Sequence, residues 1–239
     1  MTDVFYEGRD LEVLADMPNY YDWIMDAFSP YVRGHVIEYG AGAGTVSARL
    51  ALLADELTLV ELSTNLIEPL RARFSHDPKV SIISESLEDH AAHLGAEGVD
   101  TVVMVNVLEH IEDDREALTH LLRILKPGGH LLLFVPALQG LMSKLDVIHG
   151  HFRRYHRPDL TGKVKAAGGE VLLARYFDCA GVVPWLLLNK LMGSTTFNPA
   201  LIDIHDKYVV PVSRVFERVV SPPFGKNLIL VTRKPPLVS

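Results

Sequence analysis

The sequence predicts an α/β fold in which a mostly parallel β-sheet carries helices on both faces. Three observations indicate this fold. Strand-like and helix-like segments alternate along the chain, a glycine-rich turn joins one such pair within residues 36–53, and the strand-like segment 99–107 is largely apolar and β-branched. Regular alternation favours a parallel sheet, and a largely apolar strand is typical of one that is covered on both faces.

The strand predictions rest on short apolar runs that are bounded by turn-forming residues. The predicted strands are residues 34–40, 56–62, 79–86, 99–107, 130–137, 170–178 and 226–234. The helix predictions add start and stop signals, with Thr45 and then Ser63 or Thr64 as expected N-caps, and Pro158 in a first turn. The predicted helices are residues 45–54, 63–74, 113–129 and 157–169, after a helical N-terminal segment at 10–32.

Two parts of the chain lie outside this regular alternation, and both are expected at the end of the sheet where open α/β folds bind ligands. We therefore expect one domain in four parts. These parts are a helical lid at 1–34, a cofactor-binding core at 35–180, an insertion that caps the substrate at 181–224, and the last strand and tail at 225–239.

Composition narrows the class of protein. The 239 residues suffice for one α/β domain, and the 48% of hydrophobic residues can form its core. The net charge of −7 argues against a general nucleic-acid binder. The single cysteine, Cys179, fits a reducing compartment, the polar N-terminus shows no signal peptide, and no apolar run reaches about 18 residues. A cytoplasmic location is expected.

Gly40, Gly42 and Gly44 follow the first predicted strand at alternate positions. A strand that turns sharply into a helix exposes backbone N–H groups, and glycine lets a ligand approach them closely. The pattern therefore predicts a cofactor loop. A dinucleotide fingerprint would place glycine where Thr45 stands, which disfavours a nicotinamide-dependent oxidoreductase.

Several motifs extend this interpretation. Glu38-x-Gly40-x-Gly42-x-Gly44 resembles motif I of class I S-adenosylmethionine-dependent methyltransferases, and residues 99–114 and 121–137 resemble later motifs of that family, in the family's order. The resemblance covers about residues 36–136. It implies a Rossmann-like sheet of seven strands with an antiparallel last strand, S-adenosylmethionine as cofactor and S-adenosylhomocysteine as product.

The same resemblance implies the cofactor contacts. Glu61 stands where the family binds the ribose hydroxyls, which suits a carboxylate because it accepts hydrogen bonds. Residues 84–86 stand at the adenine contact, and Tyr20 belongs to an N-terminal lid, with aromatic packing as its alternative role. The expected cofactor-binding residues are Glu38, Gly40, Ala41, Gly42, Gly44, Glu61, Leu62, Glu85, Ser86, Asn106 and Tyr20.

Residues 145–160 form the most distinctive polar segment outside these motifs. They resemble a D-x-x-x-G-H-x-R-R-Y pattern of bacterial methyltransferases that are encoded beside, or fused to, glycosyltransferases. His151 is a candidate general base, and His110 is a second catalytic candidate that could instead pack a helix start. The candidate substrate residues are Tyr6, Arg153, Arg154 and Tyr155, and a salt-bridged structural loop is the alternative. No Cys/His cluster has zinc-like spacing, so no metal site is expected.

The expected function is methyl transfer to a small molecule, with O-methylation of a sugar, glycolipid precursor or other hydroxylated metabolite preferred. N- or C-methylation of a small natural product stays open, as does a non-catalytic cofactor-binding partner of a glycosyltransferase. The amphipathic segments at 180–193 and 207–220 could cover an apolar substrate, form a homodimer face, rest on a membrane surface, or pack on the sheet.

Overall fold

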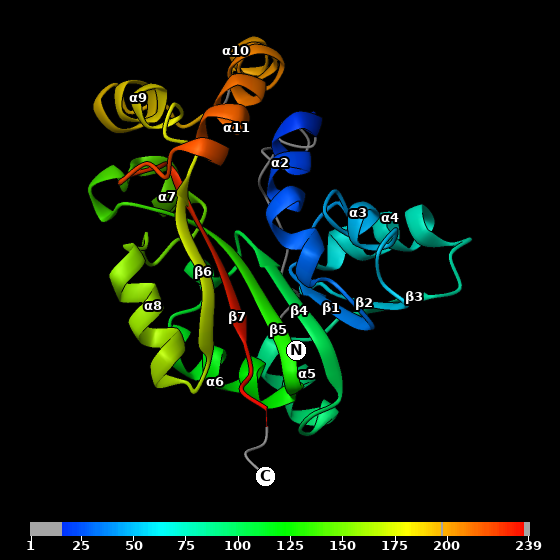
Figure 1. The fold of residues 1–239 in the computed structure, drawn as a ribbon. Helices are drawn as coiled ribbons and strands as arrows, with labels where there is room; N and C mark the ends of the chain where they lie inside the picture. Colours follow the sequence, from blue (N-terminus) through cyan, green and yellow to red (C-terminus); the bar gives the residue numbers. More distant parts are fainter. Residues whose placement is uncertain (1–15, 197, 237–239) are drawn as a thin grey trace.

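The computed structural model describes residues 16–196 and 198–236, and a seven-stranded sheet lies at its centre (Figure 1). The strands are β1 (His35–Tyr39), β2 (Glu56–Val60), β3 (Val80–Ile83), β4 (Val99–Val105), β5 (Leu125–Pro136), β6 (Glu170–Phe177) and β7 (Asn227–Arg233). Their spatial order is β3-β2-β1-β4-β5-β7-β6. Only β7 runs antiparallel within this sheet, between β5 and β6. The predicted mostly parallel sheet with an antiparallel last strand is confirmed.

Apolar side chains point to both faces of the sheet, as the strand sequences predict. In β4, Val102 and Met104 belong to one buried cluster and Val103 belongs to the other. The helices α5 (Leu87–Leu94), α6 (Asp114–Ile124) and α8 (Arg157–Ala166) contribute to the first cluster. The second cluster takes side chains from α2 (Pro18–Phe28), α3 (Ser47–Leu50) and α4 (Thr64–Phe74).

Three helix predictions need correction. Helix α6 ends at Ile124, just before the Pro-Gly-Gly stop predicted at 127–129, because Leu125 is already extended and Lys126 precedes a proline, which disfavours helical backbone. Thr45 is not an N-cap, since α3 begins at Ser47 and no side chain caps it. Helix α5 was not predicted, although Ser86 is its N-cap and accepts a hydrogen bond from the Asp89 N–H.

The chain between β6 and β7 forms a helical cap. It consists of α9 (Val182–Pro184), a π-helical turn η4 (Trp185–Leu191), α10 (Pro199–Ile204), a second π-helical turn η5 (His205–Val209) and α11 (Val210–Val219). Figure 1 shows these elements beyond the end of β6, with α7 (Lys144–Ile148) beneath them and α2 alongside. Within residues 16–196 and 198–236, no helix has the length and apolar character needed to cross a bilayer. The division into lid, core and cap stays a prediction.

The cap is tied to the start of α2 by one carboxylate. Asp206 of η5 is 2% exposed, and it accepts hydrogen bonds from the backbone N–H groups of Asn19 (3.2 Å) and Tyr20 (2.9 Å) and from the Asn19 amide (3.0 Å). These backbone groups lie in the first turn of α2, where no intrahelical acceptor exists, and Met17 at the N-cap offers no side-chain oxygen. Asp206 therefore caps α2 from 186 residues away in the sequence.

Asp206→Ala is expected to lower the free energy of unfolding by roughly 1.5–3 kcal/mol, the range for hydrogen bonds to a charged group. The buried N–H of Tyr20 and the partly buried N–H of Asn19 would lose their acceptor. Denaturant unfolding measures the change. Asp203→Ala is the matched control, because Asp203 is exposed and pairs with the exposed Lys207 one helical turn away. Equal losses in the two variants would contradict the capping role.

Candidate active site

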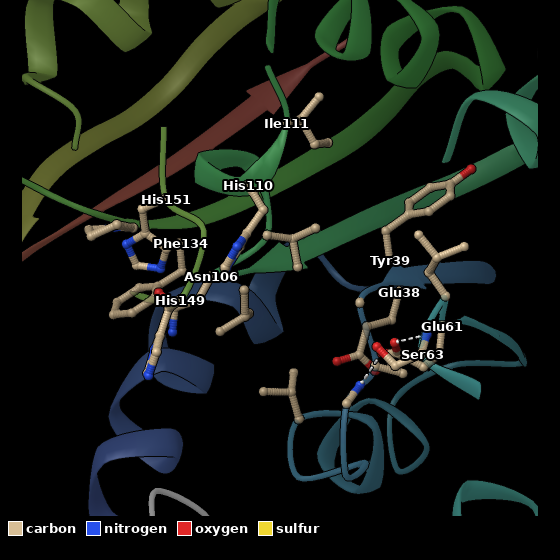
Figure 2. Close-up of a pocket in the computed structure, with 18 of the residues that line it drawn as sticks. Glu38, Tyr39, Glu61, Ser63, Asn106, His110, Ile111, Phe134, His149 and His151 are labelled. Carbon is tan, nitrogen blue, oxygen red and sulfur yellow. Dashed lines mark hydrogen bonds between the residues drawn. The ribbon is translucent and has the colours of Figure 1, made fainter. Parts of the chain in front are cut away.

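A cleft with a volume of about 740 Å³ opens at the C-terminal ends of β1, β2, β4 and β5. The glycine-rich turn forms part of its wall, and α2, the start of α5 and the segment after α7 complete it. Figure 2 shows two chemically distinct ends, with Glu38 and Glu61 at one and His110, His149 and His151 at the other. Clefts of this size hold drug-sized ligands. A donor at one end and an acceptor at the other would fit the arrangement.

The three glycines of the turn share a left-handed backbone, with φ of 70° at Gly40, 55° at Gly42 and 79° at Gly44. A Cβ on Gly40 would lie 2.4 Å from Val107 Cγ2, so packing also requires that glycine. Gly40, Ala41 and Gly42 line the cleft, and they stay candidates for the predicted cofactor contact.

Gly44 does not line the cleft. A Cβ there would lie 2.9 Å from Phe74 on α4, and its carbonyl accepts a hydrogen bond from the Ala48 N–H as α3 begins. The structure thus gives Gly44 a packing role in place of the predicted cofactor contact.

Glu61 follows β2 and fixes the turn. Its carboxylate accepts a hydrogen bond from the Gly42 N–H (2.8 Å) at one oxygen and from the Ser63 N–H (2.7 Å) at the other (Figure 2). Each oxygen keeps a further lone pair for a ligand hydroxyl. Glu38 lies nearby, accepts a hydrogen bond from the Ser47 hydroxyl, and has a pKa raised by burial to about 8.

The remaining cofactor candidates lie along the same wall. Leu62, Glu85, Ser86 and Asn106 all line the cleft. Leu62 is 45% exposed, which leaves an apolar surface for a flat ring to pack against. Asn106 ends β4 with a φ of 54°, a conformation that asparagine tolerates better than most residues.

Tyr20 reaches the cleft from α2, but its hydroxyl already has a partner. It is 7% exposed and donates a hydrogen bond to Asn227 Oδ1 at 2.9 Å. Burial raises its pKa well above the usual value, so it stays a neutral phenol. Its ring packs edge-on against Trp23, Phe134 and Phe177. These contacts favour aromatic packing, the alternative role, over a bond to the cofactor carboxylate. Tyr6 lies outside the described residues.

His151 forms a hydrogen-bonded pair with Asp146 at the end of the cleft that carries the three histidines. His151 Nδ1 lies 2.9 Å from Asp146 Oδ1, and the two side chains are 13% and 0% exposed. Burial alone would raise the pKa of Asp146, but its bonds to His151, Arg154 and Ser143 outweigh burial and hold the pKa well below its usual range. An ionised carboxylate at Nδ1 places the imidazole proton there and leaves Nε2 basic.

Glu109 lies on the far side of His151. It belongs to the 3₁₀ turn η2 (Leu108–His110) and is 0% exposed, and its Oε1 is 3.9 Å from His151 Nε2. Burial raises the pKa of Glu109 to about 7. The ring of His110, from the same turn, is perpendicular to the ring of His151 at a centroid distance of 4.6 Å.

Comparison with known proteins finds relatives among methyltransferases, and solved methyltransferase structures share the fold. Residues 37–133 match the family model described as a methyltransferase domain. This part of the chain is therefore similar to methyltransferase domains. It is 33% identical over 112 residues to an uncharacterized methyltransferase of Mycobacterium tuberculosis, a match that covers 47% of this chain and 55% of that protein.

Two further relatives broaden the comparison. A ubiquinone biosynthesis O-methyltransferase of Xanthomonas oryzae is 31% identical over 99 residues, 41% of each chain. The structure of Burkholderia thailandensis 1,6-didemethyltoxoflavin-N1-methyltransferase, with its substrate and S-adenosylhomocysteine bound, has a TM-score of 0.61 at 15% identity over 95% of this chain and 82% of that one. This chain thus spans about half the length of the curated relatives that it matches.

Two of the predicted substrate residues point away from the cleft. Arg153 pairs with Asp114 (2.9 Å) and donates hydrogen bonds to the carbonyls of Ile111 and Glu112. Tyr155 is 0% exposed, and its hydroxyl lies 2.9 Å from Asp114 Oδ2 in the core. Both predictions of substrate contact are wrong, because Arg153 and Tyr155 turn toward Asp114, whereas their neighbours Phe152 and Arg154 line the cleft.

Arg154 lines the cleft, but its charge is already compensated. Its guanidinium bonds Asp146 Oδ1 through Nε (2.9 Å) and Nη2 (2.8 Å), and it stacks 4.4 Å from the centre of the Trp185 ring. Arg154 therefore holds Asp146 in place instead of clamping an anion as predicted. Glu109 and Trp185 were missed by sequence reasoning, although the acid in the apolar "VLEHI" segment, between Leu108 and His110, was a visible signal for Glu109.

Proposed function

We propose that the protein transfers the methyl group of S-adenosylmethionine to a hydroxyl group of a small-molecule acceptor and releases S-adenosylhomocysteine. The observation that carries this proposal is the opposition of two sites in one cleft. The glycine turn and Glu61 form an end suited to the nucleoside, and the Asp146–His151 pair forms an end suited to an acid–base reaction.

Methyl transfer from a sulfonium needs an in-line approach of the acceptor, so positioning supplies much of the rate. A hydroxyl is a poor nucleophile and gains from a nearby base, whereas an amine needs none. His151 Nε2 is basic because Asp146 occupies Nδ1, and the ring lies in the cleft wall. This pair favours O-methylation over the N- or C-methylation alternative.

The proposal also covers the chemical class of the acceptor. A sugar, glycolipid precursor or other hydroxylated metabolite is proposed, and the cap helices could cover its apolar part because Leu187, Leu191 and Phe216 leave apolar side chains exposed there. A cytoplasmic location belongs to the same proposal. The glycosyltransferase-associated subgroup, a homodimer and contact with a membrane surface stay predictions.

Incubation with S-adenosylmethionine carrying a ¹³C-methyl group, together with a metabolite extract, tests the reaction. The carbon shift of the transferred methyl group in the product distinguishes O-, N- and C-methylation. Label in an O-methyl ether supports the proposal, and label only on nitrogen or carbon contradicts it. Binding of S-adenosylmethionine with no product from any extract fraction would favour the non-catalytic partner of a glycosyltransferase.

Glu61→Ala is expected to weaken binding of S-adenosylhomocysteine by roughly 1.5–3 kcal/mol, or about 10- to 150-fold, because hydrogen bonds from the ribose hydroxyls would be lost. The loss should be smaller for a 2′,3′-dideoxy analogue of the ligand, which lacks those hydroxyls. Calorimetric titration measures both affinities. Equal losses would show that Glu61 acts only by holding Gly42 and the turn.

A further inference from the structure

Glu109 is a buried carboxylate to which no described residue donates a hydrogen bond. Both of its oxygens are inaccessible to solvent, and neither has a hydrogen-bond partner among the described residues. Burying a polar group unpaired is costly, and an isolated ionised carboxylate costs far more. Nearby Asp146 shows the usual solution, since its oxygens accept bonds from Ser143, His151 and Arg154. Glu109 lacks such donors, which points to a partner outside the chain.

Two imidazoles face this carboxylate. One ligand atom each from Glu109, His110 and His151 lies within 4.8 Å of the others. The distance from Glu109 Oε1 to His151 Nε2 is 3.9 Å. With bonds of about 2.1 Å to one ion, tetrahedral ligand atoms lie roughly 3.4 Å apart, so the pair needs to close by only about half an ångström.

The supporting contacts of a metal site are also present. His151 Nδ1 bonds to Asp146, which fixes the ring and leaves Nε2 turned toward Glu109. A histidine ligand held by a carboxylate in this way is the usual arrangement around protein-bound metals. Asp146 is fixed in turn by the Ser143 N–H and hydroxyl, both at 2.7 Å, and by Arg154.

We propose that Glu109, His110 and His151 bind one divalent transition-metal ion in the wall of the cleft. Two imidazole nitrogens and one carboxylate oxygen suit Zn²⁺ or Mn²⁺, whereas Ca²⁺ prefers oxygen ligands. His110 and His151 also line the cleft, so the remaining positions of the ion would face the acceptor. No zinc-like spacing is visible in the sequence because His151 lies 41 residues after His110.

The chemical consequence rests on the proposed function, but the binding of the ion does not. An acceptor hydroxyl bound to the ion would lose its proton to water more readily, because the ion lowers its pKa. The oxygen would then form a bond to the methyl carbon as the carbon–sulfur bond breaks, and that bond's electron pair would stay on sulfur. His151 would serve as a ligand, and the ion would replace it as the activating group.

Titration of metal-free protein with Zn²⁺ and with Mn²⁺, followed by calorimetry, tests the site. The wild-type chain should bind one equivalent of at least one ion. Glu109→Gln keeps the shape of the side chain and removes its charge, and it should weaken binding at least about 100-fold. His110→Ala, at an exposed position, should weaken it as well, which guards against a folding defect in the first variant.

His120→Ala is the matched control. His120 lies 3.6 Å from Glu116 one turn away on α6, a surface pair that could take up metal nonspecifically, and its loss should leave the affinity unchanged. No stoichiometric binding to the wild type, or binding that survives both Glu109→Gln and His110→Ala, would overturn the proposal. Titrating the same samples with S-adenosylhomocysteine separates the two proposals, since cofactor binding should persist without metal.

Discussion

His151→Ala is expected to lower turnover by about 10²- to 10⁴-fold, the usual contribution of a positioned acid–base group. The affinity for S-adenosylhomocysteine should barely change, because His151 lies at the opposite end of the cleft from Glu61 (Figure 2). The fold should survive the substitution, since Asp146 keeps its bonds to Arg154 and Ser143. Steady-state kinetics and calorimetry measure the two quantities.

His156→Ala is the control for the His151 variant. His156 comes from the same segment, is exposed, and does not line the cleft, so its turnover should match that of the wild type. Unfolding temperatures must be compared in parallel, because the loss of a purely structural residue would lower the unfolding temperature. Early melting of His151→Ala with normal turnover in the cold would assign the residue a structural role and remove it from the reaction.

Gly42→Val should abolish binding of S-adenosylhomocysteine while the sheet stays folded. Gly42 lines the cleft with a φ of 55°, where a β-branched residue is strained, and its N–H is bonded to Glu61. A valine side chain would fill the space beside the turn and pull the N–H away from that carboxylate. Calorimetric titration of the variant checks the loss.

Gly95→Val is the control that distinguishes backbone strain from steric obstruction of the cleft. Gly95 follows α5 with a φ of 71°, and no atom lies within 4 Å of the position that its Cβ would take. This variant also puts a β-branched residue at a positive φ, but outside the cleft, so it should lose stability and still bind S-adenosylhomocysteine as the wild type does. Unchanged affinity in Gly42→Val would remove the glycine turn from the cofactor site.

Much of the fold could be predicted because its signals are local. Apolar runs located all seven strands, and the alternating glycines located the turn, where each glycine proved to have a positive φ. Helix ends were harder to place. Helix α6 ends at Ile124 and β5 begins at Leu125, before the predicted strand start at 130, because the register with β4 begins there and sequence periodicity does not report pairing partners.

The acceptor end of the cleft was only partly predictable, because side-chain direction and distant contacts decide it. The sequence grouped Arg153, Arg154 and Tyr155, yet alternation sends Arg153 and Tyr155 to Asp114. Glu109 and His151 are 42 residues apart, and only the fold brings them within 3.9 Å. Tyr20 lines the cleft, but its bond to Asn227 depends on a strand 207 residues away.

Binding of the cofactor is the claim on which the rest of the account depends. Calorimetric titration of the wild-type protein with S-adenosylhomocysteine, S-adenosylmethionine and NAD at two temperatures tests it most directly, because a binding enthalpy near zero at one temperature will not stay zero at the other. The account predicts saturable one-to-one binding of the first two ligands and none of NAD. Binding of NAD, or no heat from S-adenosylhomocysteine at either temperature, would contradict it.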